Sequence, residues 1–130
     1  MSQMDLKPVI MEGFSIKPLL MSSSIKVELR GSADTEARAS LNEFVTQAHA
    51  EAERLRVTEV IIDVHELYFI NSVCLKSMVM WIDRVINMPA DRRYTIRFLV
   101  DSHLHWQDRS ILALQRMAPT SVQIMNWKGE

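Results

Sequence analysis

The feature that most constrains this 130-residue chain is a short β-branched run, Val60-Ile61-Ile62-Asp63-Val64. Its apolar residues do not alternate with polar ones, which is typical of a central strand covered on both faces. Such a strand needs other strands beside it and helices packed against it. The chain is long enough to bury that core, whereas two independent cores would be cramped. The run therefore predicts one α/β domain spanning residues 1–130.

Strand and helix patterns alternate around this run. Further extended stretches are expected at Phe14–Leu20, Ile25–Arg30, Tyr94–Val100 and Val122–Trp127. Apolar residues at three- and four-residue steps predict helices over Asp34–Leu55, Ser72–Met88 and Asp108–Met117. We expect Gly31-Ser32 to end the second stretch, residues 101–107 to form a loop, and residues 1–12 to be a loosely ordered N-terminal extension. This order predicts a mixed or mostly parallel sheet of four to five strands, with about three helices packed against it.

Composition argues against several classes of function. The 15 Lys and Arg residues balance 16 Asp and Glu residues, so the net charge of −1 gives no general electrostatic reason for binding nucleic acid or an anionic membrane. A single cysteine cannot form an intramolecular disulfide framework or a Cys-based zinc site, which favours a reducing compartment. No apolar window approaches the roughly 18 residues of a membrane-spanning helix. The N-terminus also lacks the pattern of a signal peptide. We expect a soluble cytoplasmic domain.

Two groups of side chains could take part in metal binding or nucleophilic catalysis, but the sequence pattern does not supply all the residues that either site needs. His103 and His105 occupy alternate positions of a polar stretch, so both could reach one metal ion, with His65 or Cys74 needed as a third ligand. Cys74 lies in the first turn of a predicted helix, where the dipole would lower a thiol pKa. No sequence pattern supplies the oriented base that a nucleophile requires. We expect no enzymatic activity, no cofactor and no metal, with a small metal-binding protein using His103 and His105 as the remote alternative.

The segment that follows the β-branched run has a more specific shape. A buried strand is expected to end at Asp63. A second apolar segment, residues 67–70, then leads to Asn71-Ser72 at the start of a helix. Free backbone N–H groups and the helix dipole there would stabilise a phosphate on the Ser72 hydroxyl. The same residues also fit an ordinary helix start, with Asn71 as the cap and Ser72 in the first turn. Residue types alone favour this structural interpretation.

This segment resembles the STAS domain, the module of anti-sigma-factor antagonists and of sulphate-transporter tails. The family pattern is a strand ending in Asp, a short loop, an apolar pair, and Asp-Ser-Ser-Gly with a Leu that opens a helix. The matching residues, in that order, are Asp63, Phe69-Ile70, Asn71, Ser72 and Leu75. Val73 and Cys74 replace the second Ser and the Gly. The order of elements matches over residues 14–127.

The resemblance implies a bacterial signal-transduction protein without activity of its own, similar to an anti-sigma factor antagonist. Its partner would be a serine kinase or anti-sigma factor with a GHKL-type ATP fold. Ser72 would be the phosphorylation site, and a PP2C-type phosphatase would restore binding. Asp63, Asn71, Val73 and Cys74 would form the switch loop. Because Val73 cannot accept the phosphate that the second motif Ser takes in many antagonists, an unphosphorylated scaffold or a homodimeric structural module is the alternative.

The helix predicted over Ser72–Met88 is the expected partner-binding surface. If an apolar stripe that includes Met78 and Ile82 faces the core, Met80 faces solvent and Trp81 lies toward the edge. Exposed Met and Trp suit an adaptable protein interface, and ordinary core filling at a second packing surface is the alternative. The candidate contacts are Lys76, Met80, Trp81 and Arg84.

Overall fold

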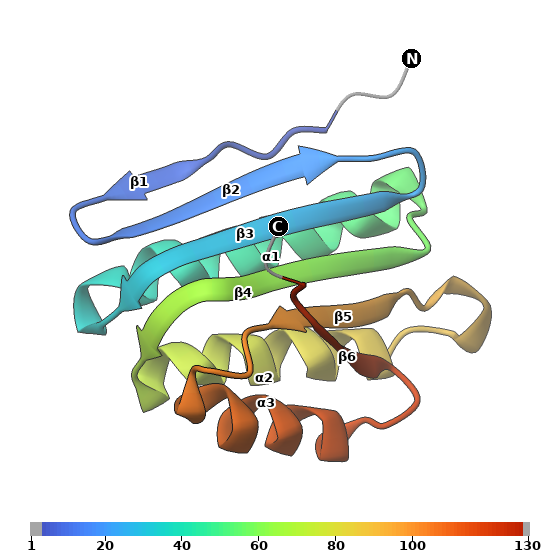
Figure 1. The fold of residues 1–130 in the computed structure, drawn as a ribbon. Coiled ribbons are helices and arrows are strands. Elements are labelled where there is room, and N and C mark those ends of the chain that lie inside the picture. The colour runs from blue at the N-terminus through green and yellow to red at the C-terminus, as the bar shows by residue number, and fades with distance from the viewer. Residues whose placement is uncertain (1–3, 129–130) are drawn as a thin grey trace.

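The computed structural model describes residues 4–128, which form one six-stranded sheet with three α-helices (Figure 1). The strands are β1 (Val9–Met11), β2 (Phe14–Leu20), β3 (Ser24–Ala33), β4 (Glu59–Ile70), β5 (Thr95–Val100) and β6 (Val122–Asn126). The helices are α1 (Arg38–Leu55), α2 (Ser72–Ile86) and α3 (His105–Met117), with short 3₁₀ turns at Thr35–Ala37 and Ala90–Arg92. The predicted α/β class and the three helices are confirmed, and the sheet has more strands than the four or five expected.

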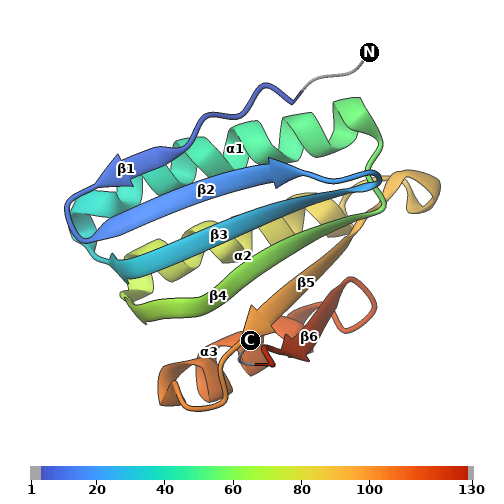
Figure 2. The ribbon, with the colours of Figure 1, turned by 45° about the horizontal axis from the view of Figure 1, so that its top comes forward.

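The strands lie in the order β1-β2-β3-β4-β5-β6. β1, β2 and β3 pair antiparallel, whereas β3 to β6 pair parallel. Each parallel pair is joined through one helix, and right-handed crossovers that all advance toward the same edge place the helices on one face. Figures 1 and 2 show α1 and α2 behind the sheet and α3 near its β6 edge. Within the described residues the opposite face carries no helix, so β4 is not covered by helices on both faces as its apolar run predicts.

The N-terminal segment is better ordered than its sequence indicates. β1 pairs with residues 14–16 of β2. Leu6 is buried, and the backbone N–H of Asp5 donates to Glu51 Oε1 in α1 at 2.8 Å. The prediction of a loosely ordered extension is therefore wrong for residues 5–11, because β2 and α1 both offer partners that no local pattern reveals. Residues 1–3 lie outside the described part of the chain.

β3 passes through Gly31 without ending there. Gly31 has a φ of +94°, and a Cβ at this position would lie 2.1 Å from the carbonyl oxygen of Gly13. The next backbone N–H, that of Ser32, donates to the same carbonyl at 2.8 Å. Only glycine allows this close approach. β3 consequently continues to Ala33, whose carbonyl accepts from the Asn71 N–H at the start of α2.

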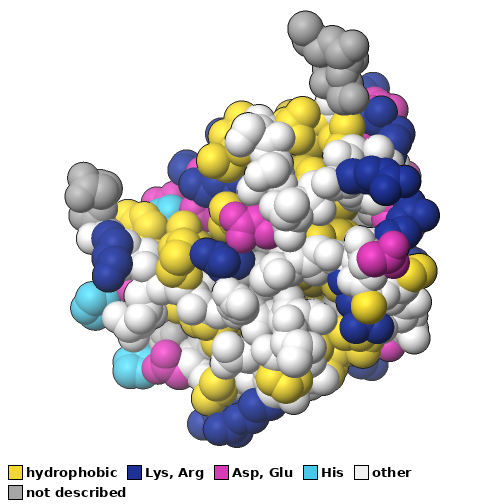
Figure 3. All heavy atoms as spheres, turned by 90° about the vertical axis from the view of Figure 1, so that its right-hand side faces the viewer, with side chains coloured by type: hydrophobic (Ala, Val, Ile, Leu, Met, Phe, Trp, Pro, Cys, Tyr) yellow, Lys and Arg dark blue, Asp and Glu magenta, His cyan; other side chains and the backbone are white. Residues whose placement is uncertain are grey.

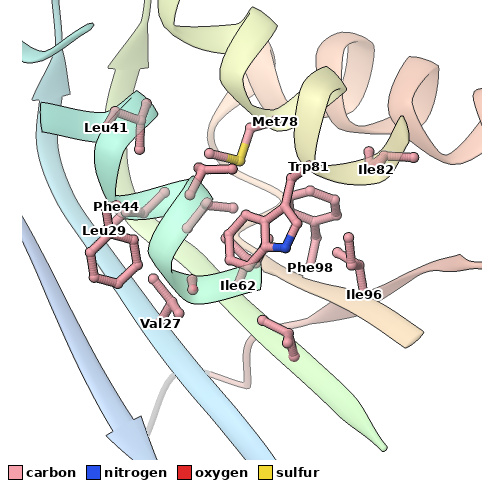
Figure 4. Packing of buried hydrophobic residues seen from close by; sticks show 14 of the residues in the cluster. Val27, Leu29, Leu41, Phe44, Ile62, Met78, Trp81, Ile82, Ile96 and Phe98 are labelled. Carbon is pink, nitrogen blue, oxygen red and sulfur yellow. The ribbon is translucent and has the colours of Figure 1, made fainter. Parts of the chain in front are cut away.

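The core lies between the sheet and the helix layer, and Figure 4 shows its centre. α2 turns residues 74, 77, 78, 81, 82 and 85 inward, so the helix is rotated relative to the predicted stripe. Trp81 is only 1% exposed, and its Nε1–H donates to Tyr94 Oη at 2.8 Å. A buried indole with a satisfied N–H is a core residue. The prediction that Trp81 contacts a partner is therefore wrong.

Candidate functional site

Asn71 fixes the corner at which α2 begins. Its Oδ1 accepts from the Cys74 backbone N–H at 2.8 Å, which makes Asn71 the N-cap. Its Nδ2 donates to Thr35 Oγ1 at 3.1 Å, and its backbone N–H donates to the carbonyl of Ala33 at 3.0 Å. One residue thus ties the end of β4 to α2 and to the connection between β3 and α1. The capping role expected for Asn71 is confirmed.

Ser72 is the first residue of α2 and is exposed. The next residue, Val73, is also exposed, at 38%. The first turn of α2, which lies wholly within the described residues, contains no acidic side chain. A phosphate on Ser72 would therefore meet the positive end of the helix dipole without an acidic neighbour in that turn.

Cys74 points in the opposite direction, beneath the corner. Its side chain is fully buried, and Sγ donates to the backbone carbonyl of Asp34 at 3.2 Å. Burial raises the pKa of the thiol, and the Asp34 carboxylate adds to the increase. The sequence-based expectation of a thiol pKa lowered by the helix dipole is thus wrong. A protonated, buried thiol is neither a nucleophile nor a metal ligand, and Cys74 serves as a small core residue.

Asp63 lies in the middle of β4 and not at its end. It stands opposite Glu28 of β3, and residues 64–70 of β4 separate it from Asn71. Its carboxylate is 2% exposed and pairs with His65 Nδ1 at 2.5 Å and with Lys26 Nζ at 3.7 Å, on the face without helices. The switch loop expected from the sequence is therefore divided: Asn71, Val73 and Cys74 meet at the corner, and Asp63 belongs to an ion-pair network farther along the strand.

α3 supports the terminal half of β4. β4 pairs with β5 only over residues 59–63, beyond which its backbone carbonyls need other donors. Gln107 Nε2 donates to the Val64 carbonyl at 2.6 Å, and Trp106 Nε1 donates to the Leu67 carbonyl at 2.9 Å. Both donors lie in the first turn of α3. The helix begins at His105, earlier than the predicted start at Asp108. Sequence reasoning missed both residues, although a Trp-Gln pair directly before an amphipathic helix was visible.

His103 and His105 do not share one extended face. His105 is the first residue of α3, whereas His103 Nδ1 lies 3.1 Å from Asp101 Oδ1 in the preceding turn. Hydrogen bonds from the backbone and side chain of His103 lower the pKa of Asp101. Among residues 4–128, no group of three or more His, Cys, Asp or Glu side chains could hold a metal ion. In particular, Cys74 and His65 do not supply the third ligand, since one is buried under α2 and the other is paired with Asp63.

Exposed apolar side chains occur on both elements that meet at the corner. Tyr68 and Phe69 at the end of β4 are 58% and 47% exposed, and Val73 and Met80 on α2 are each 38% exposed. Lys76 is exposed between these two α2 residues, three positions after Val73 and four before Met80, so all three share one helical stripe. We call these five residues the corner surface. An apolar centre with a charged residue beside it is typical of a protein interface.

Arg84 follows Met80 by four residues and continues this stripe. It is half-buried, and its Nη1 donates to Thr46 Oγ1 at 3.1 Å, which joins α2 to α1. Of the four partner contacts predicted from the sequence, the structure thus leaves Lys76, Met80 and the half-buried Arg84 on the stripe and buries Trp81. Tyr68 was not predicted, yet it was detectable: side chains alternate along a strand, so adjacent Tyr68 and Phe69 could not both face the core in a regular strand.

The end of the molecule opposite the corner carries charges of both signs. Figure 3 shows Lys and Arg side chains there interspersed with Asp and Glu. A shallow cavity behind the end of α1 is lined by Arg56, Arg92 and Arg93 and also by Glu53 and Asp91. Such mixed charge creates no extended field of one sign. Separately, none of the helices in residues 4–128 has the length and apolar character needed to cross a bilayer.

Similar folds occur in solved structures of two regulators. A crystal structure of an anti-sigma factor antagonist from Mycobacterium paratuberculosis aligns with a TM-score of 0.63 and 13% identity, covering 85% of each chain. The structure of the anti-sigma factor antagonist SpoIIAA in its unphosphorylated form aligns with a TM-score of 0.54 and 14% identity, covering 88% of this chain and 89% of SpoIIAA. The domain has a STAS-like fold. No family model and no curated protein sequence matches the chain.

Proposed function

We propose that this STAS-like domain is a non-enzymatic cytoplasmic regulator that binds a GHKL-type serine kinase or anti-sigma factor through the corner surface. The observation that carries the proposal is the exposed hydroxyl of Ser72 at the first position of α2, directly beside exposed Val73. The similar structures are those of anti-sigma factor antagonists, which supports this kind of regulatory role.

Phosphorylation of Ser72 would act on this surface by charge. A phosphate adds about −1.5 to −2 charges. Placed next to Val73, it would have to be desolvated, or to meet acidic groups of the partner, whenever the corner surface docks. Asn71 caps the helix without a carboxylate of its own, so the phosphate would be the negative charge at the start of α2, on a surface whose own charged residue is Lys76. A PP2C-type phosphatase would restore the binding-competent form.

The second candidate is a scaffold of the same fold that is never phosphorylated. Val73 stands where many antagonists have the serine that accepts phosphate, and its side chain has no hydroxyl. In this case Ser72 is an ordinary first-turn residue and Asn71 an ordinary cap. The corner surface would bind its partner equally well with and without ATP.

Affinity capture with matched variants separates these functions. Immobilised wild-type protein, Ser72→Asp and Ser22→Asp are exposed to extract of the source cell, and the captured proteins are identified by mass spectrometry. Ser22 is an exposed serine in the turn between β2 and β3, at the opposite end of the sheet, so Ser22→Asp controls for added charge. We expect wild type and Ser22→Asp to capture a GHKL-type kinase, and Ser72→Asp to capture much less.

Equal capture by Ser72→Asp would contradict the switch and support the scaffold. Failure of the wild-type protein to capture any GHKL-type protein would contradict the proposed partner class.

A further inference from the structure

The two edges of the sheet are built differently. At one edge, β1 covers only residues 14–16 of β2, and the uncovered part of β2 carries Lys17 and Pro18. A very short edge strand, a lysine and a proline are features that prevent pairing with another chain. The strand at the other edge, β6, has neither a charged residue nor a proline, and within residues 4–128 no strand pairs with its outer side.

Two backbone hydrogen bonds define which groups of β6 face β5. The N–H of Ile96 donates to the Ser121 carbonyl at 2.8 Å, and the N–H of Trp127 donates to the Val100 carbonyl at 2.7 Å. Along a strand, successive residues direct their backbone groups to opposite sides. Residues 121, 123, 125 and 127 therefore bond to β5, and the residues between them direct their backbone groups outward.

Three residues of β6 direct backbone groups to its outer side. Ile124 and Asn126 each present a free N–H and C=O at the edge, and Val122 presents its C=O. The Val122 N–H is already engaged, since it donates to the Ala118 carbonyl at 2.9 Å. Unpaired backbone groups on an uncharged edge strand are a template for a further strand.

α3 presents a matching stripe beside this edge. Asp108, Leu112 and Arg116 are exposed and follow one another at four-residue steps, so they share one face of the helix. Asp108 and Leu112 line the same groove as Ile124 and Asn126, so this part of the stripe lies beside β6. Neither Asp108 nor Arg116 forms an ion pair with another described residue.

We propose that two copies of this chain pair antiparallel through β6, about a two-fold axis at Ile124. The two Ile124 residues exchange a pair of N–H···O=C bonds. Asn126 of each copy donates its N–H to the Val122 carbonyl of the other copy, which adds two more bonds. In a regular pair the Val122 N–H would also donate to the Asn126 carbonyl of the other copy. Because this N–H is already bonded to the Ala118 carbonyl, the pairing has four backbone bonds and leaves the Asn126 carbonyls to solvent.

The α3 stripe agrees with the same axis. Antiparallel α3 helices related through Leu112 place the two leucines together. Asp108 precedes Leu112 by four residues and Arg116 follows it by four, so the two-fold axis sets Asp108 of each copy opposite Arg116 of the other. This charge complementarity is specific to a second copy of this chain, because the strand and the helix both become self-complementary about a common axis.

Such a dimer leaves both corner surfaces uncovered. Because the paired sheets run antiparallel, the α2 corners lie at opposite ends of the extended sheet, and one dimer presents two of them. The inference does not depend on the proposed function, since it rests on β6 and α3 alone.

Sedimentation equilibrium of the full chain, from low-micromolar to millimolar concentration, tests the dimer. An interface of one strand pair and one helix pair is small, and we expect reversible association in the micromolar range. Leu112→Glu weakens the association by about tenfold or more, because it places two like charges on the axis. The matched control is Met117→Glu: Met117 is 41% exposed on the same helix but lies off the stripe, so this variant associates like wild type.

Charge reversal tests the register independently. Asp108→Arg and Arg116→Asp each weaken association, since each sets like charges opposite one another, and the double variant recovers it. Circular dichroism confirms that each variant is folded. A chain that stays monomeric throughout the concentration range, equal effects of Leu112→Glu and Met117→Glu, or a double variant that fails to recover would each overturn the proposal.

Discussion

At the scale of single residues, Asn71 combines two tasks that its position in the sequence suggests only in part. It caps α2 through Oδ1, and it holds the β3–α1 connection through Nδ2. A carboxylate could perform the first task but has no proton with which to donate to Thr35. The amide therefore joins the elements of the corner without adding charge beside Ser72.

Replacing Asn71 tests its capping role. Asn71→Ala removes the cap, and we expect a loss of about 1 kcal/mol in the free energy of unfolding. Asn71→Asp keeps the cap and gains a favourable charge at the helix N-terminus, and its carboxylate can accept a hydrogen bond from the Thr35 hydroxyl. We expect this variant to be more stable than Asn71→Ala in urea titrations. Equal stabilities of the two variants would contradict the capping role.

A second residue-scale network joins α1, α2 and β5. Tyr94 Oη accepts from Trp81 Nε1 and lies 2.6 Å from His49 Nδ1. Burial lowers the pKa of His49, although nearby Glu53 partly opposes the effect, and burial raises the pKa of Tyr94. Because Tyr94 Oη already accepts from Trp81, its O–H is available to donate to Nδ1 of a neutral His49, whereas a protonated His49 would have to donate at Nδ1.

The lowered pKa of His49 predicts a pH dependence of stability. The unfolded chain binds a proton near pH 6.5, whereas the folded chain binds it only at lower pH. The resulting stability is present above pH 6.5 and is lost as the pH falls through the folded pKa. In urea titrations across this range, wild type should lose more stability than His49→Gln, which cannot titrate. Parallel pH profiles of the two proteins would refute this assignment.

At the scale of elements, α2 divides its two faces cleanly between core and surface. Its inner side packs against the sheet around Trp81, and its outer stripe contributes Val73, Lys76 and Met80 to the corner surface. Substitutions on the outer stripe should therefore affect partner binding without affecting folding.

Met80→Glu tests this division. It places a charge on the corner surface, and we expect capture of the partner to fall several-fold while the melting temperature stays within a few degrees of wild type. Leu19→Glu is the control, because Leu19 is 57% exposed on β2, away from α2. A Met80→Glu protein that binds as well as Leu19→Glu would exclude Met80 from the interface.

Side chains in the first turn of α3 form hydrogen bonds with the backbone of β4 and so stabilise its terminal half. Gln107 is 2% exposed, its Nε2 donates to the Val64 carbonyl, and its Oε1 accepts from the Asp101 N–H at 2.9 Å. The Nε2 bond gives β4 a donor in the part of the strand, after residue 63, that does not pair with β5. It also connects α3 to the strand that leads into the corner.

Gln107→Leu leaves buried backbone groups without partners, and we expect it to reduce the free energy of unfolding by roughly 2–3 kcal/mol. Amide hydrogen exchange should increase most over residues 64–70 of β4. Gln115→Leu is the matched control on the same helix, since the Gln115 side chain makes no hydrogen bond in the described part of the chain. Equal reductions in the free energy of unfolding for the two variants would show that the hydrogen bonds of Gln107 do not stabilise β4.

At the scale of the whole molecule, local patterns predicted most of the elements but not the partners of individual residues. The apolar periodicity predicted the position of α2 correctly but predicted the wrong side of the helix to be buried. Trp81 and Ser77 can face the core because their polar groups form hydrogen bonds with Tyr94 and Asn42, which lie elsewhere in the chain. β1 was missed because three residues become a strand only when β2 pairs with them. The corner itself was predictable, since capping chemistry is local.

The central claim is that phosphorylation of Ser72 controls a partner at this corner. The most direct test is to incubate purified wild-type protein and Ser72→Ala with ATP and extract of the source cell, and to locate any phosphate by peptide mass spectrometry. The account predicts one phosphate on wild-type protein, at Ser72, and none on Ser72→Ala. Wild-type protein that stays unmodified, or that carries its phosphate at another residue, would contradict it.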